Sequence, residues 1–220
     1  MFRDKIMIFK DRFHAGVLLA QKLANYKNLK GVLILAVPAG GVEVAVVIAE
    51  ELNVDLDLAN TRKIHVPWNK EAGFGAISWD GQVFLNHTLV KQLGLSDKTI
   101  QECIEKEKEV IAQRNKLFRA NQPCPKTKDR TVIVFDDGLA SGFSMLATVK
   151  ALRKLQSKEI IVAVPTAPSS AINPLLPHAD KIVCLNIRNF PIFAVADAYQ
   201  NWYDLSDYDV LQLLKRKNRA

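Results

Sequence analysis

Residues 132–144 read VIVFDDGLASGFS, and this stretch guides the interpretation of the whole chain. Its first four residues are all apolar, which is typical of a strand buried on both faces of a sheet. Asp136 and Asp137 follow at once, although two neighbouring carboxylates repel each other. The small residues that begin at Gly138 then lead into a predicted helix. A strand that ends in paired acids and a small-residue loop indicates a binding site.

The acid pair and the loop suit the two halves of a sugar phosphate. Two carboxylates can each accept a hydrogen bond from one of two vicinal hydroxyls, and they also attract a divalent cation. Small residues let the backbone approach a ligand closely, and N–H groups at a helix start bind phosphate. Together they predict a cradle for a ribose 5-phosphate. The alternative is that Asp137 caps the following helix while Asp136 is solvated.

Strands and helices alternate on both sides of this stretch, which predicts a mostly parallel α/β sheet. In such sheets ligands bind beyond the carboxyl ends of the strands, which selects residues 38–42 and 136–144. Asp80 and Gly81 supply the turn of a β-hairpin within residues 74–86. The expected strands are 32–37, 55–60, 131–136, 159–164 and 181–185, and the expected helices are 12–26, 42–52, 96–118, 142–155 and a short one after Ser206.

The composition fits a globular domain, since the 220 residues are 49% hydrophobic and 24% charged. No apolar run is long enough for a membrane span, and charges interrupt the N-terminus too often for a signal peptide, so we expect a cytoplasmic protein. The net charge of +7 is spread along the chain, which argues against a nucleic-acid partner and suits a small polyanionic substrate. The three cysteines lie far apart without CxxC spacing, so neither disulfides nor zinc is expected.

VIVFDDGLASGFS also resembles the phosphoribosyl-pyrophosphate signature of the type I phosphoribosyltransferases, in which two acids and a Ser/Thr-Gly loop follow an apolar strand. Other stretches are similar to a less characterised branch of this family, and the similarity covers roughly residues 9 to 214. These stretches are DRFHAGVLLAQKL, PAGGVEVA, TRKIHVP, GAI with the following hairpin, and FAVADAYQNWYDLSD.

The resemblance implies a single α/β domain over residues 1–220, with a twisted, mainly parallel five-stranded sheet flanked by helices. The core would occupy about residues 9–185. A hairpin at about residues 70–90 would form a flap over the substrate. A small hood would come from the chain ends, including about residues 186–214.

The resemblance also implies a role for each part of the site. Asp136 and Asp137 would bind the ribose hydroxyls and Mg²⁺, directly or through water, while Phe193 and Trp202 of the hood would contact the base. The 5′-phosphate would be held by Gly138, Leu139, Ala140, Ser141, Gly142, Phe143 and Ser144. The pyrophosphate would be held by Ala39, Gly40, Gly41, Arg62 and Lys63.

The implied activity is transfer of ribose 5-phosphate from phosphoribosyl pyrophosphate to a small nitrogen acceptor, usually a nucleobase, with Mg²⁺ as cofactor. Ala39 departs from this branch, where a basic side chain is usual. A second interpretation is therefore a regulator that binds phosphoribosyl pyrophosphate or a nucleotide without turnover. A third, nucleic-acid binding, rests on charge alone. The acceptor stays open, as does the oligomeric state, for which a homodimer is one option.

Overall fold

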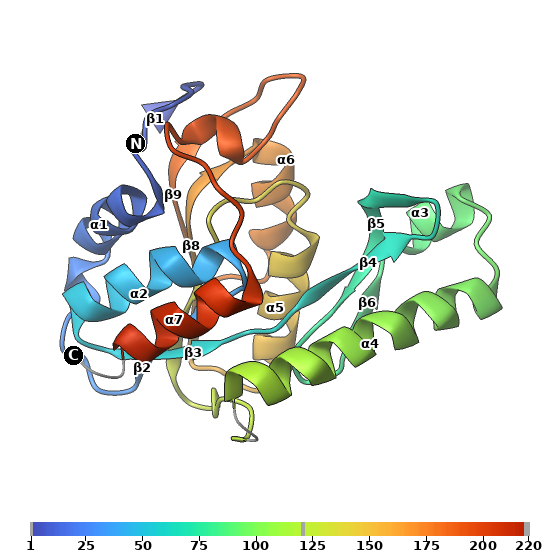
Figure 1. The fold of residues 1–220 in the computed structure, drawn as a ribbon, viewed down its shortest axis with the longest axis horizontal. Helices are drawn as coiled ribbons and strands as arrows, with labels where there is room; N and C mark the ends of the chain where they lie inside the picture. Colours follow the sequence, from blue (N-terminus) through green and yellow to red (C-terminus); the bar gives the residue numbers. More distant parts are fainter. Residues whose placement is uncertain (1, 120–121, 218–220) are drawn as a thin grey trace.

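The computed structural model describes residues 2–119 and 122–217, and it shows an α/β fold built on one parallel sheet (Figure 1). The strands follow the order β1-β9-β8-β7-β2-β3, and every neighbouring pair is parallel. The expectation of five strands is wrong by one, because β1 at the chain start pairs with the edge of β9. The six strands are β1 Phe2–Arg3, β2 Val32–Ala36, β3 Asp55–Leu58, β7 Thr131–Phe135, β8 Glu159–Ala167 and β9 Lys181–Ile187.

Helices cover both faces of this sheet and bury its alternate side chains. They are α1 Arg12–Lys22, α2 Gly40–Leu52, α5 Phe143–Lys154, α6 Ser169–Ile172 and α7 Asp207–Lys217. α1, α2 and α7 share one apolar cluster with Ile34 and Ile133, while α5 and α6 share the opposite cluster with Leu33 and Val132. Because successive strand residues face opposite sides, the apolar runs of β2 and β7 fill both clusters. Each such fully buried side chain stabilises the fold by about 1.5–3 kcal/mol.

Helix ends agree with the sequence where a capping residue marks them. The Asp11 carboxylate accepts a hydrogen bond from the His14 N–H and so starts α1. Before α7, the Ser206 hydroxyl and the Asp209 carboxylate accept each other's backbone N–H groups, as their spacing predicts. α1 ends earlier than the expected residue 26, because a short 3₁₀ turn takes up Ala24–Tyr26.

Residues 62–119 form an arm that projects from the main sheet, to the right in Figure 1. The arm holds an antiparallel sheet of order β4-β5-β6, so the expected two-stranded hairpin is one part of a three-stranded sheet. β4 is not among the expected strands, because only its Ile64 and Val66 are buried, against α4. A role for this hairpin as a mobile flap stays a prediction. The elements are β4 Arg62–Val66, β5 Asn69–Ile77, β6 Val83–Leu85, α3 His87–Gln92 and α4 Asp97–Arg119.

The carboxyl ends of β2 and β7 lie side by side. Ala36 pairs with Phe135, and the Val37 N–H donates to the Phe135 carbonyl over 2.9 Å. The two segments that the sequence singles out, 38–42 and 136–144, therefore leave the sheet next to each other.

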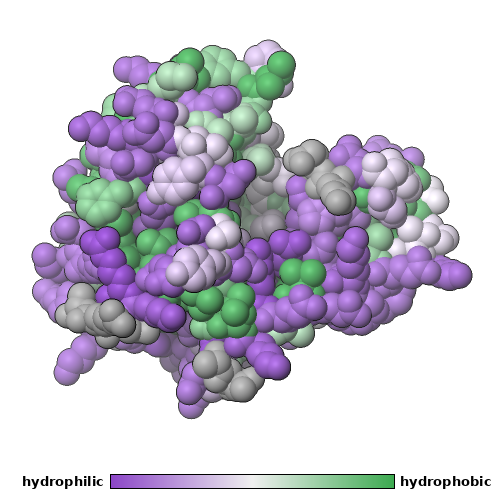
Figure 2. All heavy atoms as spheres, viewed as in Figure 1, coloured by the Kyte–Doolittle hydropathy of each residue, from purple (hydrophilic) through white to green (hydrophobic). Residues whose placement is uncertain are grey.

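The visible face is mainly hydrophilic, with apolar side chains gathered where α7 meets α4 (Figure 2). Within residues 2–119 and 122–217, the helices are too short or too polar to cross a membrane.

Candidate functional site

A cavity of about 180 Å³ opens at the carboxyl end of β7. Its walls come from three parts of the chain: Lys63 of β4, Val195 of the segment between β9 and α7, which is the expected hood and is called so below, and Asp136 with the loop 138–145. The structure thus brings together three groups of residues that the sequence selected separately: one of the two acids, the small-residue loop and one basic side chain. The cavity lies where ligands of parallel α/β sheets bind.

The loop delivers the start of α5 to this cavity. Gly142 has a φ of +74°, and a Cβ there would lie 2.9 Å from the Ala171 carbonyl oxygen, so both backbone shape and space require glycine. The first bond within the helix runs from the Leu146 N–H to the Gly142 carbonyl. Among the described residues, no side chain caps this helix start. The N–H groups before Leu146 therefore remain available to an anion such as phosphate.

Leu139 has a structural role in place of the predicted contact with the 5′-phosphate. Its side chain is buried, and its N–H donates to the Thr166 carbonyl over 2.9 Å. This bond fixes the loop to β8, so the Leu139 N–H is already engaged and cannot also face a phosphate. Gly138 lets the hood pack directly on the loop, since a Cβ there would lie 2.5 Å from Val195 Cγ1.

Asp136 lines the cavity, and its Oδ1 accepts a hydrogen bond of 2.8 Å from the Asp137 N–H. Burial is the main reason that the pKa of Asp136 lies well above its usual value, and the neighbouring charge of Asp137 adds to the shift. The structure does not support the alternative of a simply solvated Asp136. This carboxyl group lines the cavity, and its raised pKa means that it binds protons more readily than an exposed aspartate.

Asp137 faces the turn that precedes α2. A Cβ on Gly40 would lie only 1.8 Å from Asp137 Oδ2, so this carboxylate occupies the space that a side chain at residue 40 would need. Arg12 of α1 donates from its Nε to the same oxygen over 2.8 Å. Tyr199 donates its hydroxyl to the Asp137 carbonyl, and burial raises the pKa of this phenol well above its usual value. Asp137 is therefore tied to the turn, to α1 and to the hood.

The turn itself has the predicted position but carries no cation. α2 begins at Gly40, directly after Ala39, and the Pro38–Ala39 peptide bond is cis. A Cβ on Gly41 would lie 2.8 Å from the Phe135 carbonyl oxygen, so glycine lets the helix start pack on the end of β7. Backbone N–H groups at this helix start are the groups that could meet a pyrophosphate.

The two basic residues of β4 point to opposite sides. Arg62 pairs with the buried Glu107 of α4 over 3.0 Å, beside a different cavity of about 300 Å³ between β4 and α4. The structure therefore does not bring Arg62 to the predicted pyrophosphate. Lys63 does reach the loop cavity, and its stem passes over Gly73, where a Cβ would lie 2.3 Å from Lys63 Cγ.

Each predicted base-binding ring covers a buried arginine. The Trp202 ring lies over the Arg12 guanidinium, with 4.1 Å between the ring centroid and Cζ. The Phe193 ring lies over Arg188 at 4.4 Å. Both rings thus have a structural partner, and contact with a base stays a prediction for both.

Sequence reasoning missed Arg12 and Tyr199, which hold Asp137 in place. A signal for Arg12 was present, because a cation in the first turn of a helix opposes the helix dipole and so needs another reason. No such signal marks Tyr199 in the sequence, because a tyrosine among apolar residues is ordinarily read as part of the core.

The acid pair is also the predicted Mg²⁺ site. The described residues contain no group of three or more His, Cys, Asp or Glu side chains placed to hold a metal. Asp136 and Asp137 are a pair, and Mg²⁺ commonly takes one or two carboxylates together with substrate phosphates and water. The acid pair therefore fits Mg²⁺ as a companion of a bound phosphate.

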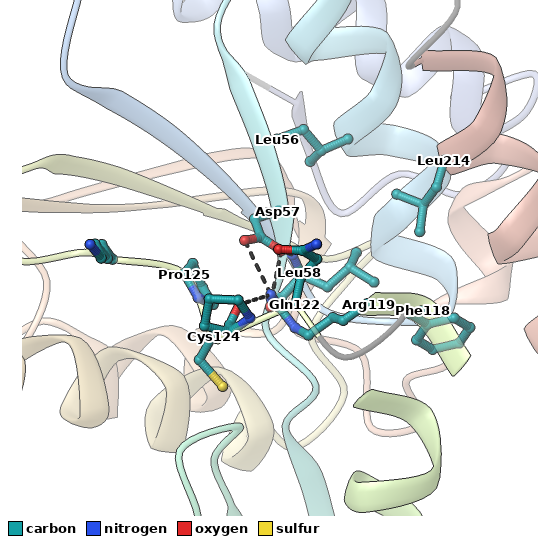
Figure 3. A pocket seen from close by; sticks show the side chains of 11 residues that line it. Leu56, Asp57, Leu58, Phe118, Arg119, Gln122, Cys124, Pro125 and Leu214 are labelled. Atoms are coloured by element: carbon teal, nitrogen blue, oxygen red, sulfur yellow. Dashed lines mark hydrogen bonds and ion pairs between the residues drawn. The ribbon is translucent and has the colours of Figure 1, made fainter. Parts of the chain in front are cut away.

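A larger cavity, of about 650 Å³, lies away from the predicted residues, beside the ends of β3 and α4 (Figure 3). Its buried arginine, Arg119, is turned toward Asp57, with 2.5 Å between Nη2 and Oδ1. Arg119 also donates to the carbonyls of Leu58 and Pro123. Because Asp57 already neutralises this arginine, this cavity is a less favourable phosphate site than the loop of residues 138–144.

Comparisons with known proteins agree with this geometry. A family model described as phosphoribosyl transferase domain matches residues 12–200. Two proteins of Mycobacterium tuberculosis, from strains CDC 1551 / Oshkosh and H37Rv, are provisionally named phosphoribosyl transferases. Each is 34% identical to this chain over 213 residues, which are 96% of this chain and 47% of the relative. The chain thus spans about half the length of these relatives.

Solved structures share the fold. The protein TT1426 from Thermus thermophilus is 31% identical and superposes with a TM-score of 0.78, covering 96% of this chain and 99% of that protein. A hypothetical protein from Neisseria gonorrhoeae, solved with bound ppGpp, is 15% identical, covers 98% of both chains and has a TM-score of 0.51. This second likeness shows the fold alone.

Proposed function

The chain belongs to the phosphoribosyl transferase domain family, and on that premise we propose that it uses phosphoribosyl pyrophosphate as donor, with Mg²⁺ and a small nitrogen acceptor. The observation that carries the proposal is the loop cavity, where Asp136 and the uncapped start of α5 face the same space. A carboxyl group for a sugar hydroxyl and free N–H groups for a phosphate are the two contacts that a ribose 5-phosphate needs.

The donor would lie across the two neighbouring segments at the sheet edge. Its 5′-phosphate would meet the residues from Ala140 to Ser144, and its ribose hydroxyls would meet Asp136 and Asp137. Its pyrophosphate would reach the start of α2 at Ala39, Gly40 and Gly41, where Asp137 already lies against Gly40. The contacts with the 5′-phosphate and the ribose would thus come from the segment after β7, and those with the pyrophosphate from the segment after β2.

The reaction would break the bond between the anomeric carbon and the pyrophosphate oxygen, while an acceptor nitrogen forms the new bond and loses its proton. The ribose then carries oxocarbenium-like positive charge in the transition state. Asp136 and Asp137 would orient the ribose through its hydroxyls, and Lys63 would stabilise negative charge on a phosphate. Bound Mg²⁺ would supply charge neutralisation for the departing pyrophosphate.

A second candidate function is phosphoribosyl pyrophosphate or nucleotide binding without turnover. Two observations favour it: Ala39 supplies no cation to the turn, and Arg62 is paired with Glu107. Lys63 at the loop cavity could suffice for binding and fail to accelerate the departure of pyrophosphate.

Pyrophosphate release separates these functions. Catalysis predicts Mg²⁺-dependent release when the protein meets phosphoribosyl pyrophosphate and one member of a panel of nucleobases and small amines. Pure binding predicts calorimetric binding of the donor without release at any acceptor. If the donor does not bind, both functions are wrong. Ala39→Arg is expected to raise turnover, because it returns a cation to the turn.

A further inference from the structure

We propose that Arg12 is a positioning residue, which holds Asp137 for the ribose and joins this carboxylate to the hood; the inference rests on the proposed function. The arginine is 2% exposed. It donates from Nε to Asp137 Oδ2 over 2.8 Å and from Nη1 to the Tyr203 carbonyl over 2.9 Å. The Trp202 ring closes over it at 4.1 Å. One side chain thus connects α1, the end of β7 and the C-terminal segment.

Two of the hydrogen bonds around the acid pair engage one oxygen of each acid. Asp137 uses Oδ2 for Arg12, and Asp136 uses Oδ1 for the Asp137 N–H. Neither Asp137 Oδ1 nor Asp136 Oδ2 takes part in these two bonds. Two vicinal hydroxyls need two acceptors, and these two oxygens belong to adjacent residues. Arg12 sets the orientation of the Asp137 carboxylate and therefore the direction of one acceptor.

Arg12 has a second role, which is to balance the negative charge of nearby carboxylates. Glu43 of α2 lies 3.8 Å from Arg12 Nη1, so one cation serves the carboxylates of Asp137 and Glu43. Without Arg12, the carboxylates of Asp137 and Glu43 would lose the cation that they share in a poorly solvated place, where unpaired charges are costly. The loop that would bind the phosphate is held separately, through the bond from the Leu139 N–H to Thr166. Loss of Arg12 should therefore affect the sugar contacts and spare the phosphate contacts.

Calorimetry with two probes tests this division. The probes are ribose 5-phosphate and inorganic phosphate, and the variants are Arg12→Met, Arg12→Lys and the control Arg130→Met. Arg130 pairs with Asp55 over 2.6 Å at the opposite end of the strands, so its loss removes an ion pair far from the site. In Arg12→Met, affinity for ribose 5-phosphate should fall about tenfold or more, as expected for one lost charge-assisted contact.

The pattern across probes distinguishes positioning from a general structural role. Phosphate affinity of Arg12→Met should stay within about twofold of wild type, because a tenfold change would need a lost contact. Arg12→Lys should recover part of the ribose 5-phosphate affinity, and Arg130→Met should bind both probes like wild type. Equal losses for both probes, or no loss for ribose 5-phosphate, would overturn the inference.

A second variant keeps the test decisive if Arg12→Met does not fold. Trp202→Leu removes one of the two rings that lie over the guanidinium and keeps that of Tyr203, at 5.2 Å, and it should weaken ribose 5-phosphate binding while sparing phosphate. Unchanged ribose 5-phosphate affinity in a folded Trp202→Leu protein would also overturn the inference. If wild type binds neither probe, the proposed function fails as well. If wild type binds both and the variants do not discriminate, only the role of Arg12 fails.

Discussion

Gly40→Ala should destabilise the protein through one contact, between residue 40 and the carboxylate of Asp137. The added Cβ would lie 1.8 Å from Oδ2 and 2.3 Å from Cγ, so rotating the short aspartate side chain away is the available relief. That rotation breaks the bond of 2.8 Å to Arg12. Breaking a buried ion pair costs about 3–5 kcal/mol, but Arg12 keeps Glu43 and the Tyr203 carbonyl, so we expect about 2 kcal/mol.

A double-mutant cycle assigns this cost to the contact. In an Asp137→Ala background the space beside residue 40 is empty, and Gly40→Ala should cost less than about 0.5 kcal/mol there. The measurement is urea unfolding of wild type, both single variants and the double variant. With a slope of about 1–3 kcal/mol per molar urea, the midpoint of Gly40→Ala should fall by about 1 M relative to wild type. The same cost in both backgrounds would show that the contact with Asp137 is not its source.

Two further predictions concern charge. Because the folded state raises the pKa of Asp136, it binds more protons than the unfolded state, and stability is lost as pH rises through the raised pKa. Asp136→Asn should therefore melt higher than wild type at about pH 8, with a difference that shrinks toward about pH 4; a constant difference would contradict this. Lys63→Met should weaken phosphoribosyl pyrophosphate binding about tenfold or more. The neighbouring Arg62→Met should instead lower the free energy of unfolding by about 1–3 kcal/mol, because Glu107 loses a partner, and the reverse pattern would contradict the assignment of the two side chains.

The main sheet could be predicted from the sequence because its central strands are uniformly apolar. Residues 32–36 are all buried, and so are residues 131–135 apart from the half-buried Thr131. Almost every position is therefore apolar and indicates a buried strand. β1 gave no comparable signal, because its two residues are exposed and owe their strand geometry to pairing with β9. β4 was missed for a related reason, since polar and charged residues occupy the positions beside Ile64 and Val66.

The site could be predicted in part. The loop 138–144 and the turn 38–41 follow from chain order, because parallel strands place their carboxyl ends at one edge. The direction in which a side chain points could not be predicted in this way. Adjacent residues Arg62 and Lys63 face different cavities, and the partner of Asp137 lies 125 positions earlier, at Arg12. Such long-range pairs depend on how helices pack and leave little trace in a single sequence.

A crystal structure with phosphoribosyl pyrophosphate and Mg²⁺ would show directly where the donor binds. We expect the 5′-phosphate on the N–H groups at the start of α5, the ribose hydroxyls on Asp136 and Asp137, and the pyrophosphate beside Gly40. A donor bound elsewhere, for example in the cavity beside Arg119, or an empty loop at saturating donor, would contradict this expectation.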